Sequence, residues 1–265
     1  MGELKKRVIA GIFLAPLTAF LFYILPLKWF FAFLVVVAVL AVFEGITMAK
    51  IPNKHLSLFI IIACLVPLYY KSYQAYIIWL IASPLIYLLI RLAFYRGNTA
   101  DLNKEIIQAV AAILLCEVFI VLPLFYVYML KELNDYLPLI LLFALWSSDT
   151  CAYFAGKTFG KTPLVPQISP KKTFEGLIGA IFGSMLIIVL TIRLSGLSLT
   201  NSLIIGFLTG LLGQLGDIFE SISKRVSDVK DSSSLIPGHG GILDRIDSFI
   251  FTAPFLYNIY CLAGI

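Results

Sequence analysis

The chain has 265 residues, of which 60% are hydrophobic and 13% are charged, and its mean hydropathy is +0.98. Soluble domains are about 45–50% apolar and about 25% charged, so the composition excludes an ordinary soluble domain and indicates a polytopic membrane protein. The net charge of +5 is modest and forms no extended basic face, which argues against a nucleic-acid partner. The four cysteines are scattered in apolar runs, without the spacing of a zinc site or a disulfide framework.

A spanning helix takes roughly 20 apolar residues, and about nine segments of the chain approach that length. We therefore predict an all-α integral membrane protein, a polytopic bundle of about nine transmembrane helices. The segments are 8–25, 27–48, 56–70, 74–94, 105–130, 136–156, 174–194, 201–222 and 247–264. The first resembles a signal peptide, but its apolar run is long and no clear cleavage site follows, so we interpret it as a span. We divide the chain into N-terminal helices (1–72), middle helices (73–135) and a region with polar motifs (136–265).

Positive charge in membrane proteins gathers on the cytoplasmic side. With nine spans, 16 of the 20 Lys and Arg residues fall on one set of loops and helix ends. The opposite set holds only Lys28, Lys71, Lys131 and Arg193. This distribution predicts a multi-pass protein of the cell (inner) membrane with a cytoplasmic N-terminus. It also places the loops 157–173 and 223–246 together on the cytoplasmic side.

The stretch 213–248 is dense in charge and glycine, although apolar runs flank it. Its acids and cations are Asp217, Glu220, Asp228, Asp231, Asp244, Asp247, Lys224, Arg225, Lys230 and Arg245. His239 lies among Gly238, Gly240 and Gly241. Carboxylates suit hard cations such as Mg²⁺, whereas Lys, Arg and glycine-rich backbone suit phosphate. The stretch predicts a metal-and-phosphate site at a membrane surface.

Four of the six acids form two pairs, Asp217 with Glu220 and Asp244 with Asp247, and the spacing of three residues places each pair on one helical face. For Asp217 and Glu220 the alternative is an interfacial pair solvated by headgroups, but an acid inside a span costs about 2.5–3.5 kcal/mol, which favours a function for Asp217. For Asp244 and Asp247 the alternative is a favourable interaction with a helix dipole. We predict that Asp217, Asp244 and Asp247 hold Mg²⁺ at a one- or two-metal site.

The stretch resembles the signature of the phosphatidate cytidylyltransferases (CDP-diacylglycerol synthases). The residues in register are Ser221, Lys224, Arg225, Lys230, Asp231, Pro237, His239, Gly240, Gly241, Asp244, Arg245 and Asp247. Ser223 departs from the pattern, because the family usually has an apolar residue there. The blocks 146–161, with Asp149, and 169–176 (SPKKTFEG) are similar to further blocks of the family. Taken alone, the lysines of SPKKTFEG would be a topology signal; the resemblance makes Ser169, Lys171, Lys172, Thr173 and Glu175 site candidates.

The resemblance implies an enzyme of phospholipid biosynthesis that joins CTP to phosphatidic acid and releases CDP-diacylglycerol and pyrophosphate. Mg²⁺ is the implied cofactor, with a second cation as an alternative. The implied catalytic residues are Asp217, Asp244, Asp247, Lys224, Arg225 and His239, with His239 interpreted as positioning rather than transferring a proton. The implied substrate-binding residues are Ser169, Lys171, Lys172, Thr173, Lys230, Asp231, Gly240, Gly241, Arg245 and Asp149.

Two alternatives remain at this stage. A related CTP-dependent enzyme with another lipid acceptor, or a polyprenol kinase, would share a similar CTP loop. A cation-coupled transporter would use its acids to line a pathway, although transporters often show internal repeats and none is visible here. The sequence leaves the oligomeric state open, with a homodimer as one possibility.

Two further acids lie in apolar segments. Glu44 is near a predicted cytoplasmic helix end, where we expect it to be solvated. Glu117 is near mid-membrane, where we expect it to be protonated or bonded to a neighbouring helix, and neither acid is given a role. The pairs Gly179/Gly183 and Gly206/Gly210 predict close packing of their helices.

Overall fold

The computed structural model describes residues 2–95, 99–236 and 240–263, and the side chains of 12–95, 102–236 and 240–262. His239 lies outside the described residues. The helices are α1 (Gly2–Ile24), α2 (Leu27–Met48), α3 (Lys54–Ala63), α4 (Leu65–Tyr69), α5 (Tyr73–Phe94), α6 (Thr99–Cys116), the π-helix η1 (Glu117–Val121), α7 (Leu122–Leu133), α8 (Leu137–Phe159), α9 (Phe174–Leu190), α10 (Ile192–Ser195), α11 (Leu199–Val226), α12 (Leu243–Ile246) and α13 (Phe249–Ala263). The strands are β1 (Pro163–Val165) and β2 (Ser169–Thr173).

Each of the nine predicted segments is helical, which confirms the all-α prediction. Five helices within the described ranges are long and apolar enough to cross a membrane. They are Leu27–Met48, Tyr73–Phe94, Leu102–Leu133, Leu137–Phe159 and Leu199–Val226. Ile12–Ile24, Lys54–Tyr69 and Phe174–Leu190 are shorter apolar helices. The protein therefore has several membrane-spanning helices by length and composition, while the count of nine remains a prediction.

The predicted segment 56–70 is divided into α3 and α4 at Cys64. Pro67 has no N–H to donate to the carbonyl of Ala63, and its ring crowds that carbonyl, which explains the break. In contrast, the segment 105–130 is continuously helical, because α6, η1 and α7 follow one another without a break.

Helices α8, α9 and α11 pack closely through glycines. A Cβ at Gly183 would collide with the carbonyl oxygen of Ser147 on α8, and a Cβ at Gly210 would collide with Ser184 and Ile181 on α9. Glycine lets helix backbones approach in this way. The predicted close packing is confirmed, and it fixes α11 against the two helices that lead into and out of the strands.

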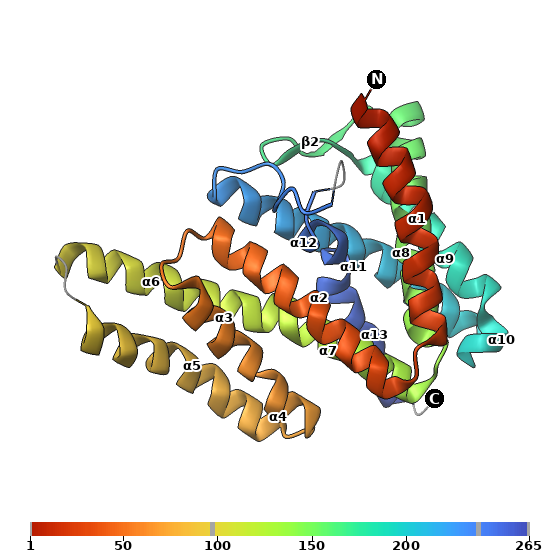
Figure 1. Ribbon diagram of the computed structural model, residues 1–265. Coiled ribbons are helices and arrows are strands. Elements are labelled where there is room, and N and C mark those ends of the chain that lie inside the picture. The colour runs from red at the N-terminus through yellow and green to blue at the C-terminus, as the bar shows by residue number, and fades with distance from the viewer. Residues whose placement is uncertain (1, 96–98, 237–239, 264–265) are drawn as a thin grey trace.

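The predicted loop 157–173 contains a small antiparallel hairpin. Strand β1 pairs with β2 through Pro163 with Thr173 and Val165 with Ser169. Figure 1 shows this hairpin at the same end of the bundle as the chain between α11 and α12. The two polar loops of the sequence therefore lie at one end of the molecule.

The buried acid Glu117 lies at the start of η1. Trp79 Nε1 and Ser83 Oγ on α5 donate to its carboxylate at 3.2 and 2.9 Å. Of the two expectations for Glu117, bonding to a neighbouring helix is therefore observed. These contacts attach α5, which is otherwise largely exposed, to the centre of the bundle.

Candidate active site at the hairpin end of the bundle

Lys172 on β2 forms an ion pair with Asp217 on α11, with 2.6 Å between Lys172 Nζ and Asp217 Oδ2. The same ammonium donates to Gln214 Oε1 at 3.4 Å, and Gln214 Nε2 donates to Asp149 Oδ1 on α8 at 3.1 Å. Ser221 Oγ donates to Asp217 Oδ1 at 3.3 Å. The hairpin, α8 and α11 thus bring together three motifs that are far apart in the sequence.

Asp247 joins this group because α11 lies very close to the chain between α12 and α13. A Cβ at Gly216 would collide with the carbonyl oxygen of Asp247, so only glycine permits the approach. The Asp247 carboxylate interacts electrostatically with those of Asp217 and Asp149, and Arg245 interacts with Asp149. We name as the Asp217 cluster the residues Asp149, Lys172, Gln214, Asp217 and Asp247.

Asp244 on α12 lies in a different set of contacts. Lys224 Nζ is 2.6 Å from Asp244 Oδ1 and also pairs with Glu220 on its own helix. Asp244 Oδ2 accepts hydrogen bonds from Ser232 Oγ at 2.7 Å, from Ser232 N at 3.0 Å and from Gly241 N at 2.8 Å. Burial acts to raise the pKa of Asp244, but Lys224 and the Gly241 and Ser232 donors outweigh it and lower the pKa to about 2.

Glu44, from the last turn of α2, belongs to the same contacts, and the expectation that it is solvated was wrong. Its side chain is buried, and it accepts hydrogen bonds from Ser232 Oγ at 3.0 Å and Ser233 Oγ at 2.6 Å. The chain after α11 folds back over the end of α2 and replaces water with protein donors. We name as the Asp244 cluster the residues Glu44, Glu220, Lys224, Ser232, Ser233 and Asp244.

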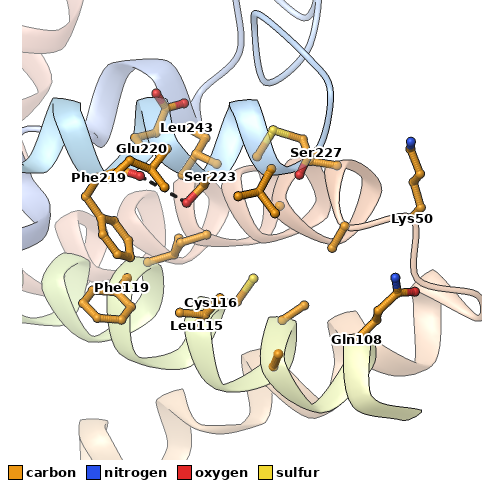
Figure 2. Close-up of a pocket in the computed structure, with 18 of the residues that line it drawn as sticks. Lys50, Gln108, Leu115, Cys116, Phe119, Phe219, Glu220, Ser223, Ser227 and Leu243 are labelled. Atoms are coloured by element: carbon orange, nitrogen blue, oxygen red, sulfur yellow. Dashed lines mark hydrogen bonds between the residues drawn. The ribbon is translucent and has the colours of Figure 1, made fainter. Parts of the chain in front are cut away.

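An apolar pocket of about 740 Å³ lies next to the Asp244 cluster, between α2, α6, η1 and α11. Figure 2 shows Lys50 and Gln108 at one end of it and the rings of Phe119 and Phe219 at the other. Glu220 lines the pocket and also pairs with Lys224. Ligand pockets have volumes of about 300–1,000 Å³, so the size suits a small molecule or part of a larger one.

Residues 5–263 match the Cytidylyltransferase family. The chain belongs to this family. It is 34% identical over 272 residues to "Phosphatidate cytidylyltransferase" of Bacillus subtilis (strain 168), which covers 99% of both chains. The protein of that name from Thermotoga maritima is 30% identical over 269 residues, covering 98% of this chain and 97% of its own. The one from Aquifex aeolicus (strain VF5) is 43% identical over 140 residues, 52% of this chain and 53% of its own.

The sequence assigned Mg²⁺ in this cytidylyltransferase to three acids, and the structure separates them. Asp217 and Asp247 lie in one cluster and Asp244 in the other. Within the described ranges, no three or more His, Cys, Asp or Glu side chains form a group that could hold a metal ion. Mg²⁺ needs only one or two protein carboxylates when phosphate and water supply its other ligands. Asp217, with 32% of its side chain exposed, together with Asp247 fits that requirement.

Several other predicted residues have structural contacts. Thr173 caps α9, because its Oγ1 accepts from Gly176 N at 3.1 Å. Arg225 donates to the carbonyls of Ile168 and Val229 at 3.4 and 3.3 Å, which ties the end of α11 to the hairpin. The exposed candidates are Lys171, Lys230, Asp231 and Arg245, and Ser169 and Glu175 are half-buried. Gly240, with φ of +78°, bonds through its carbonyl to Ile236 N.

Sequence reasoning missed two residues that hold these clusters together. Gln214 is the only bridge described between Lys172 and Asp149, and Glu44 binds the chain after α11. A signal existed for each, since both are polar residues within apolar helices. Gln214 also lies three residues before Asp217, on the same helical face.

Proposed function

We propose that this chain is a phosphatidate cytidylyltransferase, which converts CTP and phosphatidic acid to CDP-diacylglycerol and pyrophosphate. The observation that carries the proposal is the Lys172–Asp217 pair, where the SPKKTFEG block meets the charged stretch of α11. The full-length similarity to bacterial proteins of that name supports the same activity. The Asp217 carboxylate pairs with Lys172, is open to solvent and interacts with the carboxylate of Asp247, and this arrangement suits a ligand that brings both phosphate and a divalent cation.

In the proposed reaction, an oxygen of the lipid phosphate attacks the α-phosphorus of CTP. The new P–O bond forms as the bond to pyrophosphate breaks, and no proton has to be removed because the lipid oxygen is already anionic. The protein therefore acts by positioning the two phosphates and neutralising their charge. Lys172 exchanges its bond to Asp217 for a phosphate oxygen, and Gln214 keeps the ammonium in place. Arg225, Arg245 and Lys230 add positive charge at the rim.

Mg²⁺ is proposed as the cofactor. Asp217 and Asp247 would hold it, with Asp149 nearby. When bound, it supplies positive charge to the triphosphate and to the leaving pyrophosphate. For Asp244 to become a ligand, it would have to exchange its bond to Lys224 for the metal.

We assign one acyl chain of the lipid to the apolar pocket between α2, α6 and α11. Its lining is dominated by apolar side chains such as Ala112, Leu115 and Ile222, which suit a hydrocarbon chain. Lys50 and Lys104 lie on its rim, where they are able to attract a lipid phosphate. The head group would reach the Asp217 cluster along the exposed side of α11.

The proposed topology is nine crossings of the cell membrane, with the N-terminus and the active site on the cytoplasmic side. Single cysteines at the exposed positions Thr162 and Ser234 test it in a cysteine-free background. Impermeant thiol reagents should label both from the cytoplasmic side only. Labelling of the two positions from opposite sides contradicts a shared site.

Turnover is the decisive test of the activity. Purified full-length protein is mixed with labelled CTP, phosphatidic acid and Mg²⁺, and the label should become lipid-soluble with release of pyrophosphate. A polyprenol as acceptor serves as the comparison. For the first reaction the label is in the cytidine or the α-phosphate, and for the polyprenol it is in the γ-phosphate, because a kinase transfers that group and releases CDP. Transfer of the γ-phosphate label to the polyprenol, without transfer of the cytidine label to phosphatidic acid, favours a polyprenol kinase.

A further inference from the structure

Glu44 binds two separate segments of the chain through all four of its nearest donors. Oε1 accepts from Ser233 Oγ at 2.6 Å and from Ile242 N at 3.0 Å. Oε2 accepts from Ser232 Oγ at 3.0 Å and from Leu243 N at 2.9 Å. Each oxygen therefore binds one hydroxyl from the first segment and one backbone N–H from the second. The two carboxylate oxygens of Glu44 therefore have equivalent sets of hydrogen-bond donors.

The two segments bound by Glu44 lead directly to Asp244. Ser232 donates to Glu44 and also lies 2.7 Å from Asp244 Oδ2, and Leu243 precedes Asp244 in the chain. Asp244 in turn holds Lys224 at 2.6 Å. Glu44 thus fixes the backbone on both sides of the Asp244–Lys224 pair, although it has no described contact with the Asp217 cluster.

Gly241 gives independent support for this contact. A Cβ at Gly241 would collide with Ser232 Oγ and with both carboxylate oxygens of Glu44. The glycine required here belongs to the same motif as Asp244, so the motif is shaped to fit around the Glu44 carboxylate. Glu44 itself comes from α2, outside the blocks that resemble the family's signature.

We propose that Glu44 is a positioning residue of the active site, and this inference rests on the proposed cytidylyltransferase activity. Glu44 clamps segments 232–233 and 242–243 together. The clamp holds Asp244 and Lys224 so that they face the substrates. Glu44 acts through the backbone and Ser232 and does not touch the reacting atoms. Its loss should lower kcat more than it changes the KM for CTP, because the CTP-facing Asp217 cluster remains assembled.

The informative substitution is Glu44→Gln. The amide keeps one acceptor oxygen but places an NH₂ group against the donors of the other. A serine hydroxyl can rotate and accept from that NH₂, whereas the backbone N–H of Ile242 or Leu243 cannot. One backbone N–H is left without an acceptor, and hydrogen bonds to a charged group are lost, so we expect kcat to fall at least about tenfold.

Glu117→Gln is the matched control. Glu117 is also a buried acid that accepts from neutral donors, but its described donors Trp79 and Ser83 lie on α5 and not in the motif loops. The control should keep wild-type kcat after correction for folded protein. Equal losses of kcat in the two variants would reduce Glu44 to a general packing role and overturn the proposal.

A readout that does not depend on activity separates this proposal from the proposed function. Lys230 is exposed and lies two residues before the clamped segment. In full-length protein in detergent, trypsin should cut after Lys230 several-fold faster in Glu44→Gln than in wild type or Glu117→Gln. Unchanged cleavage overturns the clamp, whether or not the protein turns over CTP. If wild type shows no cytidylyltransferase activity but Glu44→Gln is still cleaved faster than wild type, the clamp is kept and the proposed function is rejected.

Ser233→Ala keeps the test decisive if Glu44→Gln does not fold. It removes the 2.6 Å donor to Glu44 and the acceptor of Leu235 N, and it should lower kcat a few-fold and speed cleavage after Lys230. If Glu44→Gln does fold, the effect of Ser233→Ala on kcat should disappear in the double variant, since its partner is already altered. Fully additive losses contradict a shared clamp.

Discussion

The Asp217 cluster and the Asp244 cluster contain similar residues but satisfy them differently. In the Asp244 cluster, the carboxylates of Glu44 and Asp244 have seven described donor groups between them, of which the Ser232 hydroxyl is shared by the two. In the Asp217 cluster, each carboxylate has fewer described donors. Asp149 accepts from Gln214, and Asp247 accepts from Ser248. Asp217 pairs with Lys172 and accepts from Ser221, and 32% of its side chain remains exposed. A carboxylate whose donors are all supplied by the protein holds those protein segments in place. A carboxylate with few protein donors is free to bind a cation, such as a metal ion that carries a phosphate. The comparison assigns the ligand-facing role to the Asp217 cluster. It assigns the framework role to Glu44 and its serine partners, which hold Asp244 and Lys224 toward the substrates.

Asp217→Asn should have the largest effect on activity. The amide keeps the shape of the carboxylate but removes the charge that faces Lys172 and the proposed metal. Turnover should fall by about 10²–10³-fold, the range for loss of one preorganised electrostatic group. The apparent melting temperature should stay the same or rise without metal, because one of three crowded negative charges is gone. Wild-type turnover with unchanged Mg²⁺ dependence contradicts the ligand-facing role.

Lys172→Ala should lower turnover by roughly tenfold to a hundredfold. This loss is no larger than the loss of about 10²–10³-fold that follows removal of one hydrogen-bond donor to a transition state. The reason is that Lys172 is the one lysine described in contact with Asp217. Lys161→Ala, an exposed lysine of the same loop, is the control for a change in topology signal. If both variants insert correctly and turn over equally, Lys172 is no part of the site.

Asp244→Asn should differ from Asp217→Asn in its effect on stability. It takes the anionic partner from Lys224, which is buried together with Asp244, and weakens the bonds from Ser232 and Gly241. The loss should be about 1–3 kcal/mol, seen as a lower melting temperature without Mg²⁺, and turnover should fall as well. A melting temperature equal to that of wild type would contradict the proposed difference in stability effects between the two clusters.

Ser221→Ala and Ser232→Ala should give the smallest effects and still separate the clusters. Ser221 donates one long bond, 3.3 Å, to the partly exposed Asp217, so its loss should change turnover a few-fold and leave the melting temperature unaltered. Ser232 lies between two buried carboxylates, and its loss should lower the melting temperature by several degrees. Thermal unfolding and turnover measured on both variants provide the check.

The sequence predicted the features that depend on local composition. Apolar runs predicted the helices, glycine spacing predicted the close packing of α9 and α11, and the resemblance brought Asp149, Lys172 and Asp217 into one site. The partners of Glu44 and Asp244 were not predictable, because a carboxylate near a helix end looks the same in sequence whether water or a distant loop surrounds it. The hairpin was missed because β1 has only three residues.

The split of three acids into two clusters also escaped the sequence. Asp244 and Asp247 share one face of a helix in a periodicity argument, and that argument assigns them a common ligand. In the structure, Gly216 brings the backbone of Asp247 against α11, whereas Asp244 lies against Lys224 and the turn at Gly241. The conformation of the chain between α11 and α12 decides which neighbours Asp244 and Asp247 contact. This segment has no periodic sequence pattern from which its conformation could be predicted.

The contact between Glu44 and Ser232 has a consequence for biosynthesis, because 188 residues separate the two. At a translation rate of about 5–20 residues per second, the loop that buries the Glu44 carboxylate is synthesised roughly 10–40 s after α2. During that interval the Glu44 carboxylate lacks the donors that segments 232–233 and 242–243 supply, so water has to solvate it. Nascent chains that stop before residue 232 should therefore keep α2 accessible to a water-soluble reagent, and release of the finished C-terminal loop should close it.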